Sequence, residues 1–266
     1  MDSVVDISWL TLALFFTSLV VPFTISRYYQ LGLSREILVS VARMTLQLML
    51  VGVYLEYLFK LNSLTINIAW ILVMTLIGAS AIASKAKLPR AHLMLPVACG
   101  LLIALVPMLA IIVLAVVKPI PCYNAQYLVP LAGMLLGNSM SGNIVALQNF
   151  FNAFEERKSE YEAAISLGAS TSYATLPFVR DAIALSLAPS LATMTTTGLV
   201  TLPGMMTGQI LGGASPIVAI KYQIMIMIAI FVTMSLSIAV SLKLVVKRCI
   251  HPHGRVLVKV ESSQPH

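Results

Sequence analysis

Long apolar runs without charged side chains are the feature that most limits what this sequence can fold into. Residues 93–117 form a run of 25 positions without a charged residue. A helix of about 20 apolar residues crosses the hydrocarbon core of a bilayer. Charged residues make up only 10% of the chain, against roughly 25% in soluble domains. The sequence therefore predicts an all-α integral membrane protein with one domain, 1–266.

The apolar runs predict seven transmembrane helices. The longest segment between two of them, 149–178, is a polar loop, and 247–266 is a polar tail. The predicted spans cover residues 6–25, 37–58, 66–83, 93–117, 128–148, 180–201 and 217–246.

The distribution of Lys and Arg predicts the orientation of these spans. Thirteen of the 17 basic residues fall in segments on one side, three fall on the other, and Arg43 falls inside a span. Basic loops face the cytoplasm, so we expect the N-terminus outside, and the loop 149–178 and the C-terminus inside. The net charge of +7 then reports topology and contact with anionic lipid, and it indicates no nucleic-acid partner.

The loop 149–178 concentrates charge. Six charged residues occupy the eight positions 155–162. Helical spacing places Phe151, Phe154, Tyr161 and Ile165 on one face. Gly168 suits the left-handed end of that helix, and Ser170 suits the N-cap of a second short helix that Pro177 interrupts.

Two interpretations of this helix-glycine-helix elbow stay open. It is either an amphipathic hairpin lying on the bilayer or a docking site for another protein. Helices on membrane surfaces are usually rich in Lys and Arg, whereas residues 155–162 hold four acidic and two basic side chains. The small residues beside Gly168 would let a partner approach closely. We therefore favour a docking elbow between the fifth and sixth spans.

Polar residues in the fifth span form the first candidate for a translocation pathway. Gly133, Gly137 and Ser141 lie four residues apart, as in close helix contacts. Amide and hydroxyl groups at membrane depth need partners, so the alternative is ordinary helix packing with hydrogen bonds between helices. The candidate pathway residues here are Asn138, Ser139, Met140 and Asn143.

The segment 202–216 is the second candidate. It has four glycines and two prolines and almost no charge, so it suits neither a continuous helix nor an ordinary exposed loop. A broken or re-entrant outer gate that includes Met205, Met206 and Gln209 is one interpretation. A tight outer turn is the other.

Arg43 in the second span needs a partner or access to water. Asp181, at the start of the sixth span, lies at a similar depth, and we expect a buried Arg43–Asp181 pair. The alternative is that Arg43 extends to the nearby membrane surface.

A metal site is not evident from the sequence. The four histidines lie outside the spans, and no group of carboxylates falls at mid-membrane. Thioethers favour Cu(I), but the 14 methionines also suit helix packing. A metal substrate would therefore be complexed or bound weakly, unless the substrate is not a metal.

Four motifs carry a resemblance over nearly the whole chain. The motifs are "VARMTLQLMLVG" at 41–52, "VPLAGMLLGNSM" at 129–140, "EAAISLGAS" at 162–170 and "TTGLVTLPGMMTGQILGGASPIVAIKYQIMIM" at 196–227. Together they resemble the FetB/YbbM family of iron-export ABC transporter permeases, which has plant relatives tied to aluminium tolerance.

The resemblance implies a non-enzymatic permease subunit in the bacterial inner membrane. The sequence has no G-x-x-x-x-G-K-[ST] pattern, so ATP would bind a separate P-loop ATPase chain rather than this one. The resemblance further implies a homodimer in a two-to-two complex. By the same resemblance, the ATPase would dock on Glu162, Ala163, Ala164, Gly168 and Ser170.

Two other functions stay open. A secondary transporter or channel predicts ionisable residues at mid-membrane, where this chain has almost none. A membrane adaptor that recruits a cytoplasmic partner would use the same elbow without transporting anything.

Overall fold

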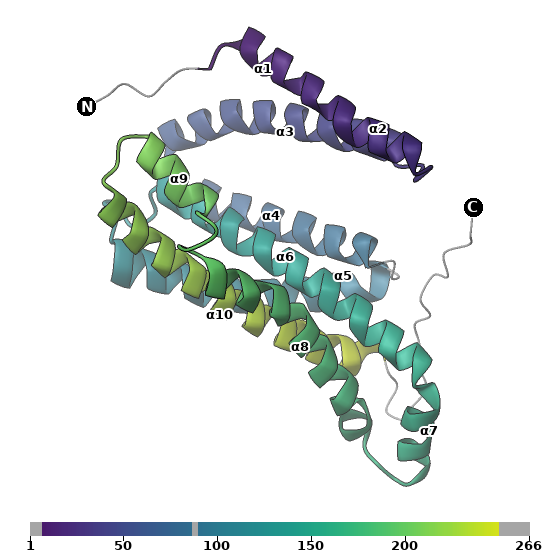
Figure 1. Cartoon of the computed structure of the whole chain (residues 1–266). Helices are drawn as coiled ribbons and strands as arrows, with labels where there is room; N and C mark the ends of the chain where they lie inside the picture. The colour runs from purple at the N-terminus through teal and green to yellow at the C-terminus, as the bar shows by residue number, and fades with distance from the viewer. Residues whose placement is uncertain (1–6, 87–89, 250–266) are drawn as a thin grey trace.

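The computed structural model describes residues 7–86 and 90–249, and regular structure in this part is helical (Figure 1). One isolated bridge pairs Thr197 with Thr201. Exposed fractions are those of the single chain. The elements are α1 (Trp9–Phe15), the 3-10 turn η1 (Phe16–Leu19), α2 (Val20–Tyr28), α3 (Ser34–Leu61), α4 (Leu64–Lys85), α5 (Arg90–Ile111), the π-helical η2 (Ile112–Val117), α6 (Ala125–Glu156), α7 (Lys158–Ser166), α8 (Thr171–Thr196), α9 (Gly204–Leu211) and α10 (Pro216–Cys249).

Six helical stretches in the described part are long and apolar enough to cross a membrane. They are Trp9–Tyr28, Ser34–Leu61, Leu64–Lys85, Leu93–Val117, Ala125–Glu156 and Pro216–Cys249. Each covers or overlaps one of the predicted spans. Helix α8, which covers most of the predicted sixth span, is 26 residues long but carries Arg180, Asp181 and many Ser and Thr residues. A seventh crossing therefore stays a prediction. Of the predicted tail, 250–266 lie outside the described residues.

A bundle of α4, α5, α6, α8 and α10 forms the core. Helix α10 packs along α5 and α6, while α4 and α8 flank α6. Small residues allow the close approach: a Cβ at Gly142 would lie 2.7 Å from the Met234 sulfur, and one at Gly100 would overlap Ser241 Oγ. Close backbone approach through small residues is how membrane helices associate without a hydrophobic driving force.

The first two spans lie to one side of this bundle (Figure 1). Within α1, η1, α2 and α3 only Ser26 and Leu58 are buried. Helix α3 is fixed near its C-terminal end, where Leu58 joins a small cluster with Ala125 and Val129. The side chain of Asn62 accepts a hydrogen bond from the Ala125 N–H at 3.1 Å.

Helix α8 corrects the predicted end of the elbow. We expected Pro177 to interrupt a short helix before the sixth span, but α8 runs unbroken from Thr171 to Thr196. A proline removes one backbone donor, so Pro177 leaves the carbonyl of Tyr173 without its helical partner, as Pro189 does for Leu185. Burial of Ala174, Phe178 and Ala182 in the core offsets that local cost. The second helix of the elbow and most of the predicted sixth span are therefore one continuous helix.

Candidate coupling elbow and translocation face

The elbow projects from the bundle where α6, α7 and α8 meet (Figure 1). Arg157 separates α6 from α7 with φ −108° and ψ 33°. Gly168 follows α7 with φ +86°. The Gly168 N–H donates to the Ile165 carbonyl at 2.9 Å and the Ala169 N–H to the Ala164 carbonyl at 3.0 Å. This is the Schellman arrangement, in which glycine avoids the steric penalty of the left-handed conformation.

Ser170 begins α8 as its N-cap. Its side-chain oxygen accepts a hydrogen bond from the Tyr173 N–H at 3.3 Å, and its backbone is extended. Such a cap satisfies one of the free amides at a helix start and contributes about 1 kcal/mol. The turn between α7 and α8 is therefore defined at both ends.

An aromatic cluster holds the elbow against the bundle. The ring centroids of Phe154 and Tyr161 are 4.7 Å apart, and those of Phe154 and Phe178 are 5.4 Å apart. These residues come from α7, α8 and the end of α6, and all three are buried. Burial raises the pKa of the Tyr161 phenol above its ordinary value. Aromatic pairs at these distances are worth about 0.5–1.5 kcal/mol beyond their buried area.

Arg157 closes the cluster from outside. Its guanidinium carbon lies 4.7 Å from the Phe178 ring centroid, which is a cation–π contact. Its Nη2 donates to Asp181 Oδ2 at 2.7 Å, and its Nη1 lies 3.9 Å from Glu160 Oε2. One arginine thus joins the end of α6, the first turn of α7 and the middle of α8.

The tip of the elbow exposes two large side chains that the sequence analysis did not select. Leu167 is 88% exposed and Tyr173 is 72% exposed. They flank Gly168 and Ser170, so their position beside the turn was a signal in the sequence. Among the predicted docking residues, Glu162 and Ala163 are exposed, Ala164 is half-buried, and Glu162 Oε1 lies 3.5 Å from Lys158 Nζ.

The structure separates the candidate pathway residues of α6. Ser139 and Asn143 are buried inside the bundle, where Asn143 Nδ2 donates to Ser237 Oγ on α10 at 2.8 Å. Asn138 is exposed and donates to the Met134 carbonyl at 2.9 Å. Met140 is half-buried against the core. Ser139 and Asn143 are therefore placed for helix packing, and Asn138 is placed on an open face.

That open face of α6 is unusually polar and small for a surface at membrane depth. Gly137 and Ser141 lie on it beside Asn138 and are also exposed. The C-terminal part of α8 also exposes Thr193 and Thr195, whose hydroxyls bond to carbonyls of their own helix, but these two residues point to different sides of α8. We name Gly137, Asn138 and Ser141 of α6 the polar face.

The segment 202–216 folds as the short helix α9 between two turns, packed against α10. Met205 contacts the core, Met206 is half-buried, and Gln209 Oε1 is buried without a hydrogen-bond partner. Buried amides without partners are costly. The side-chain oxygen of Gln209 therefore still needs a hydrogen-bond donor.

The expected Arg43–Asp181 pair is not formed. Asp181 pairs with Arg157 instead, and Arg43 is exposed on α3, outside the core bundle. The sequence analysis placed both residues by depth alone, whereas the fold separates α3 from α8. In the described part of the chain, no group of three or more His, Cys, Asp or Glu side chains could hold a metal ion.

These features define an integral membrane protein with several apolar helices and a structured polar elbow. Comparison with known sequences identifies its family. The profile of the uncharacterised protein family UPF0014 matches residues 9–250. The chain belongs to this family, which includes membrane permeases, and this confirms the resemblance seen in its motifs.

Three relatives show how far the similarity extends. "Protein ALUMINUM SENSITIVE 3" of Arabidopsis thaliana is 34% identical over 74% of this chain and 70% of its own length. "UPF0014 membrane protein slr1647" of Synechocystis is 30% identical over 96% and 99%. "Probable iron export permease protein FetB" of Escherichia coli is 31% identical over 81% and 82%. No solved structure matches the chain.

Proposed function

We propose that this chain is the membrane-spanning subunit of an ATP-driven ABC transporter, and that a separate P-loop ATPase docks on the elbow. The observation that carries the proposal is the elbow itself. It is a capped turn with an exposed Leu167 at its tip, joined by aromatic contacts and by Arg157 to α6 and α8. A partner that moves the tip would therefore move two long helices together.

The proposed assembly is a homodimer with two ATPase subunits, in the bacterial inner membrane. Helix α8 makes the seventh crossing, with the N-terminus outside and the elbow in the cytoplasm. The polar face then lies towards the second copy and lines the pathway. Exposed hydroxyl and amide groups at membrane depth favour a position beside water or protein over one beside lipid.

The proposed cargo is iron or another metal-related solute, exported from the cytoplasm. The name of the Escherichia coli relative suggests this cargo. Asn138 and Ser141 offer neutral oxygen ligands, which suit a hydrated or complexed ion better than a bare one. Metal-stimulated ATP turnover by the purified complex, measured with iron salts and iron chelates, tests the cargo separately from the assembly.

The docking proposal is tested by co-purification from native membranes in a mild detergent. Leu167→Glu places a charge at the elbow tip and should abolish recovery of the ATPase. Leu199→Glu is the matched control, because Leu199 is 91% exposed and lies just beyond the opposite end of α8. The control and the unmodified chain should each bring down the ATPase near one-to-one.

Two results would contradict the proposal. Equal recovery of the ATPase with Leu167→Glu and Leu199→Glu would place the docking surface elsewhere. Recovery of no P-loop protein by the folded, unmodified chain would favour a membrane adaptor or a transporter that works without ATP. Flux in reconstituted vesicles would then separate those two functions.

A further inference from the structure

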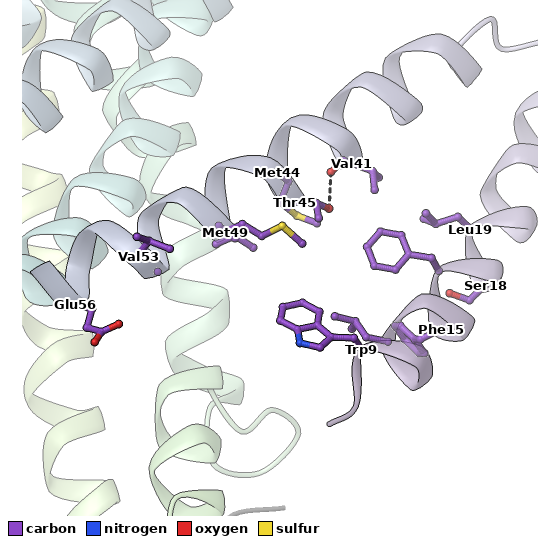
Figure 2. Close-up of a pocket in the computed structure, with 14 residues that line it drawn as sticks. Trp9, Phe15, Ser18, Leu19, Val41, Met44, Thr45, Met49, Val53 and Glu56 are labelled. Atoms are coloured by element: carbon purple, nitrogen blue, oxygen red, sulfur yellow. Dashed lines mark hydrogen bonds between the residues drawn. The ribbon is translucent and has the colours of Figure 1, made fainter. Parts of the chain in front are cut away.

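An open apolar groove of about 810 Å³ lies between the first span and α3 (Figure 2). Side chains such as Phe15, Leu19, Met44 and Met49 form its walls. Thr45 also lines it, but its hydroxyl donates to the Val41 carbonyl at 2.9 Å, so Thr45 offers the groove no free donor. The groove therefore suits an apolar occupant.

The two spans do not close this groove on their own. The span Trp9–Tyr28 contacts α3 through α2, where Ser34 Oγ donates to Ser26 Oγ at 3.3 Å. On the groove, α3 carries Gly52, where an added Cβ would meet nothing within 4 Å. Glycine inside a helix costs roughly 0.5–1 kcal/mol relative to alanine. Here it widens the groove by one side chain.

The mouth of the groove carries a pair of opposite charges. Glu56 lines the groove and accepts a hydrogen bond from Lys60 Nζ at 2.8 Å, with the two side chains 71% and 73% exposed. Exposed pairs of this kind contribute little stability, so both groups are free to change partners. Because α1 runs antiparallel to α3, Trp9 at the start of α1 lies towards the Glu56 end of the groove. Tryptophan is enriched at membrane–water interfaces, which suits this position.

The groove is long enough for one lipid chain. From Val41 to Glu56 it follows 15 helical rises of α3, or about 22 Å. Half of the hydrocarbon core is about 15 Å thick, so a single acyl chain from one leaflet fits along it. The exposed Glu56–Lys60 pair at one end complements a headgroup that carries one positive and one negative charge, which favours a phospholipid over an apolar helix.

We propose that the groove binds one acyl chain of a zwitterionic phospholipid with a primary amine, such as phosphatidylethanolamine. Its ammonium group pairs with Glu56 and its phosphate with Lys60, so that both charges keep a partner. The lipid fills the space between the first span and α3 and joins the two. This site requires only that the chain spans a membrane, and it is independent of the ATPase and of the cargo.

Quenching of Trp9 fluorescence by brominated acyl chains tests the site. The chain has two tryptophans, and Trp70→Phe keeps an aromatic ring beside Tyr54 while leaving Trp9 as the single emitter. The protein is placed in phosphatidylcholine nanodiscs with increasing brominated phosphatidylethanolamine. Half-maximal quenching is expected at a mole fraction about tenfold lower than with brominated phosphatidylcholine or phosphatidylglycerol. One or two added hydrogen bonds between charged groups are enough to give a preference of that size.

Three variants assign the signal to the groove. Gly52→Phe fills the groove without a clash and should abolish the tight component, whereas Gly52→Ala should keep it. Glu56→Gln should remove the preference for the primary amine. Quenching that rises linearly and equally with all three lipids would overturn the proposal in favour of bulk lipid. Absent quenching, together with a disulfide between two copies of Gly52→Cys, would overturn it in favour of a second copy.

Discussion

The core bundle and the α1–α3 pair are both apolar and helical, yet they are held in different ways. In the bundle, α10 approaches α5 so closely that Gly100 faces Ser241 without room for a methyl group. In the pair, Gly52 faces open space and a groove of about 810 Å³ separates the spans. The bundle is held by contacts within the chain, and the pair depends on whatever surrounds it.

The difference explains where polar groups are tolerated. The bundle encloses Ser139, Asn143 and Ser237 and pairs the last two across α6 and α10. The α1–α3 pair keeps the charged side chains of Glu56 and Lys60 exposed near one end of α3. Buried polar groups need partners in protein, whereas groups near a membrane surface find water or lipid headgroups. The same substitution should therefore have opposite consequences in the two regions.

Replacing glycine by alanine is the largest expected contrast. At Gly100 the new methyl group would overlap Ser241 Oγ and lie 3.0 Å from the Ser241 nitrogen and 3.1 Å from the Ser237 oxygen. Overpacking against backbone costs about 1–3 kcal/mol. Gly100→Ala should therefore lower the free energy of unfolding by that amount, measured by reversible denaturation in mixed detergent.

Gly52→Ala is the matched control for this prediction. It meets no neighbour and should leave the unfolding free energy unchanged or raise it by up to about 1 kcal/mol, since alanine favours the helix. If Gly52→Ala lowered the unfolding free energy as much as Gly100→Ala, another part of the assembly would have to pack against α3 as tightly as the bundle helices pack against each other.

Arg157 gives the next contrast, because it ties the elbow to the bundle. Arg157→Ala loses the cation–π contact with Phe178 and the bond to Asp181. For a partly exposed arginine we expect a local loss on the order of 1 kcal/mol. Amide hydrogen exchange in 158–166 should then speed up about fivefold, while exchange in α3 stays the same.

A double-mutant cycle with Asp181→Ala separates the ion pair from the ring contact. We expect a coupling energy of about 0.2–1 kcal/mol between the two residues. Arg157→Lys should keep part of the coupling, because its charge stays while its planar contact with Phe178 is lost. Zero coupling would show that the bond to Asp181 contributes nothing, and that Arg157 acts through Phe178 and Glu160.

The sequence predicted what depends on local pattern. Apolar run length located six helical stretches, because a spanning helix needs only length and composition. Gly168 and Ser170 were selected from turn chemistry, and they occupy the two sides of the α7–α8 turn. Each of these predictions depends on a few neighbouring residues.

The sequence could not predict which face of a helix meets which neighbour. Asn138 and Asn143 belong to one motif, yet one is exposed and the other buried, because α10 covers only one side of α6. Asp181 pairs with a residue 24 positions away rather than with Arg43. Depth in the membrane follows from the sequence, but neighbours at the same depth follow from how helices are arranged around one another.

Asn138 and Asn143 of α6 provide the smallest expected effect and separate packing from transport. Asn143→Leu removes the bond to Ser237 and should cost about 0.6 kcal/mol, which is typical for a hydrogen bond between membrane helices. Asn138→Leu on the polar face should leave the unfolding free energy unchanged, because Asn138 bonds only to its own helix. If the polar face lines the pathway, Asn138→Leu should instead lower metal-stimulated flux more than Asn143→Leu does. The reverse order of flux would place the pathway along α10, inside the bundle, where the buried oxygens of Ser139 and Thr233 have no hydrogen-bond partner.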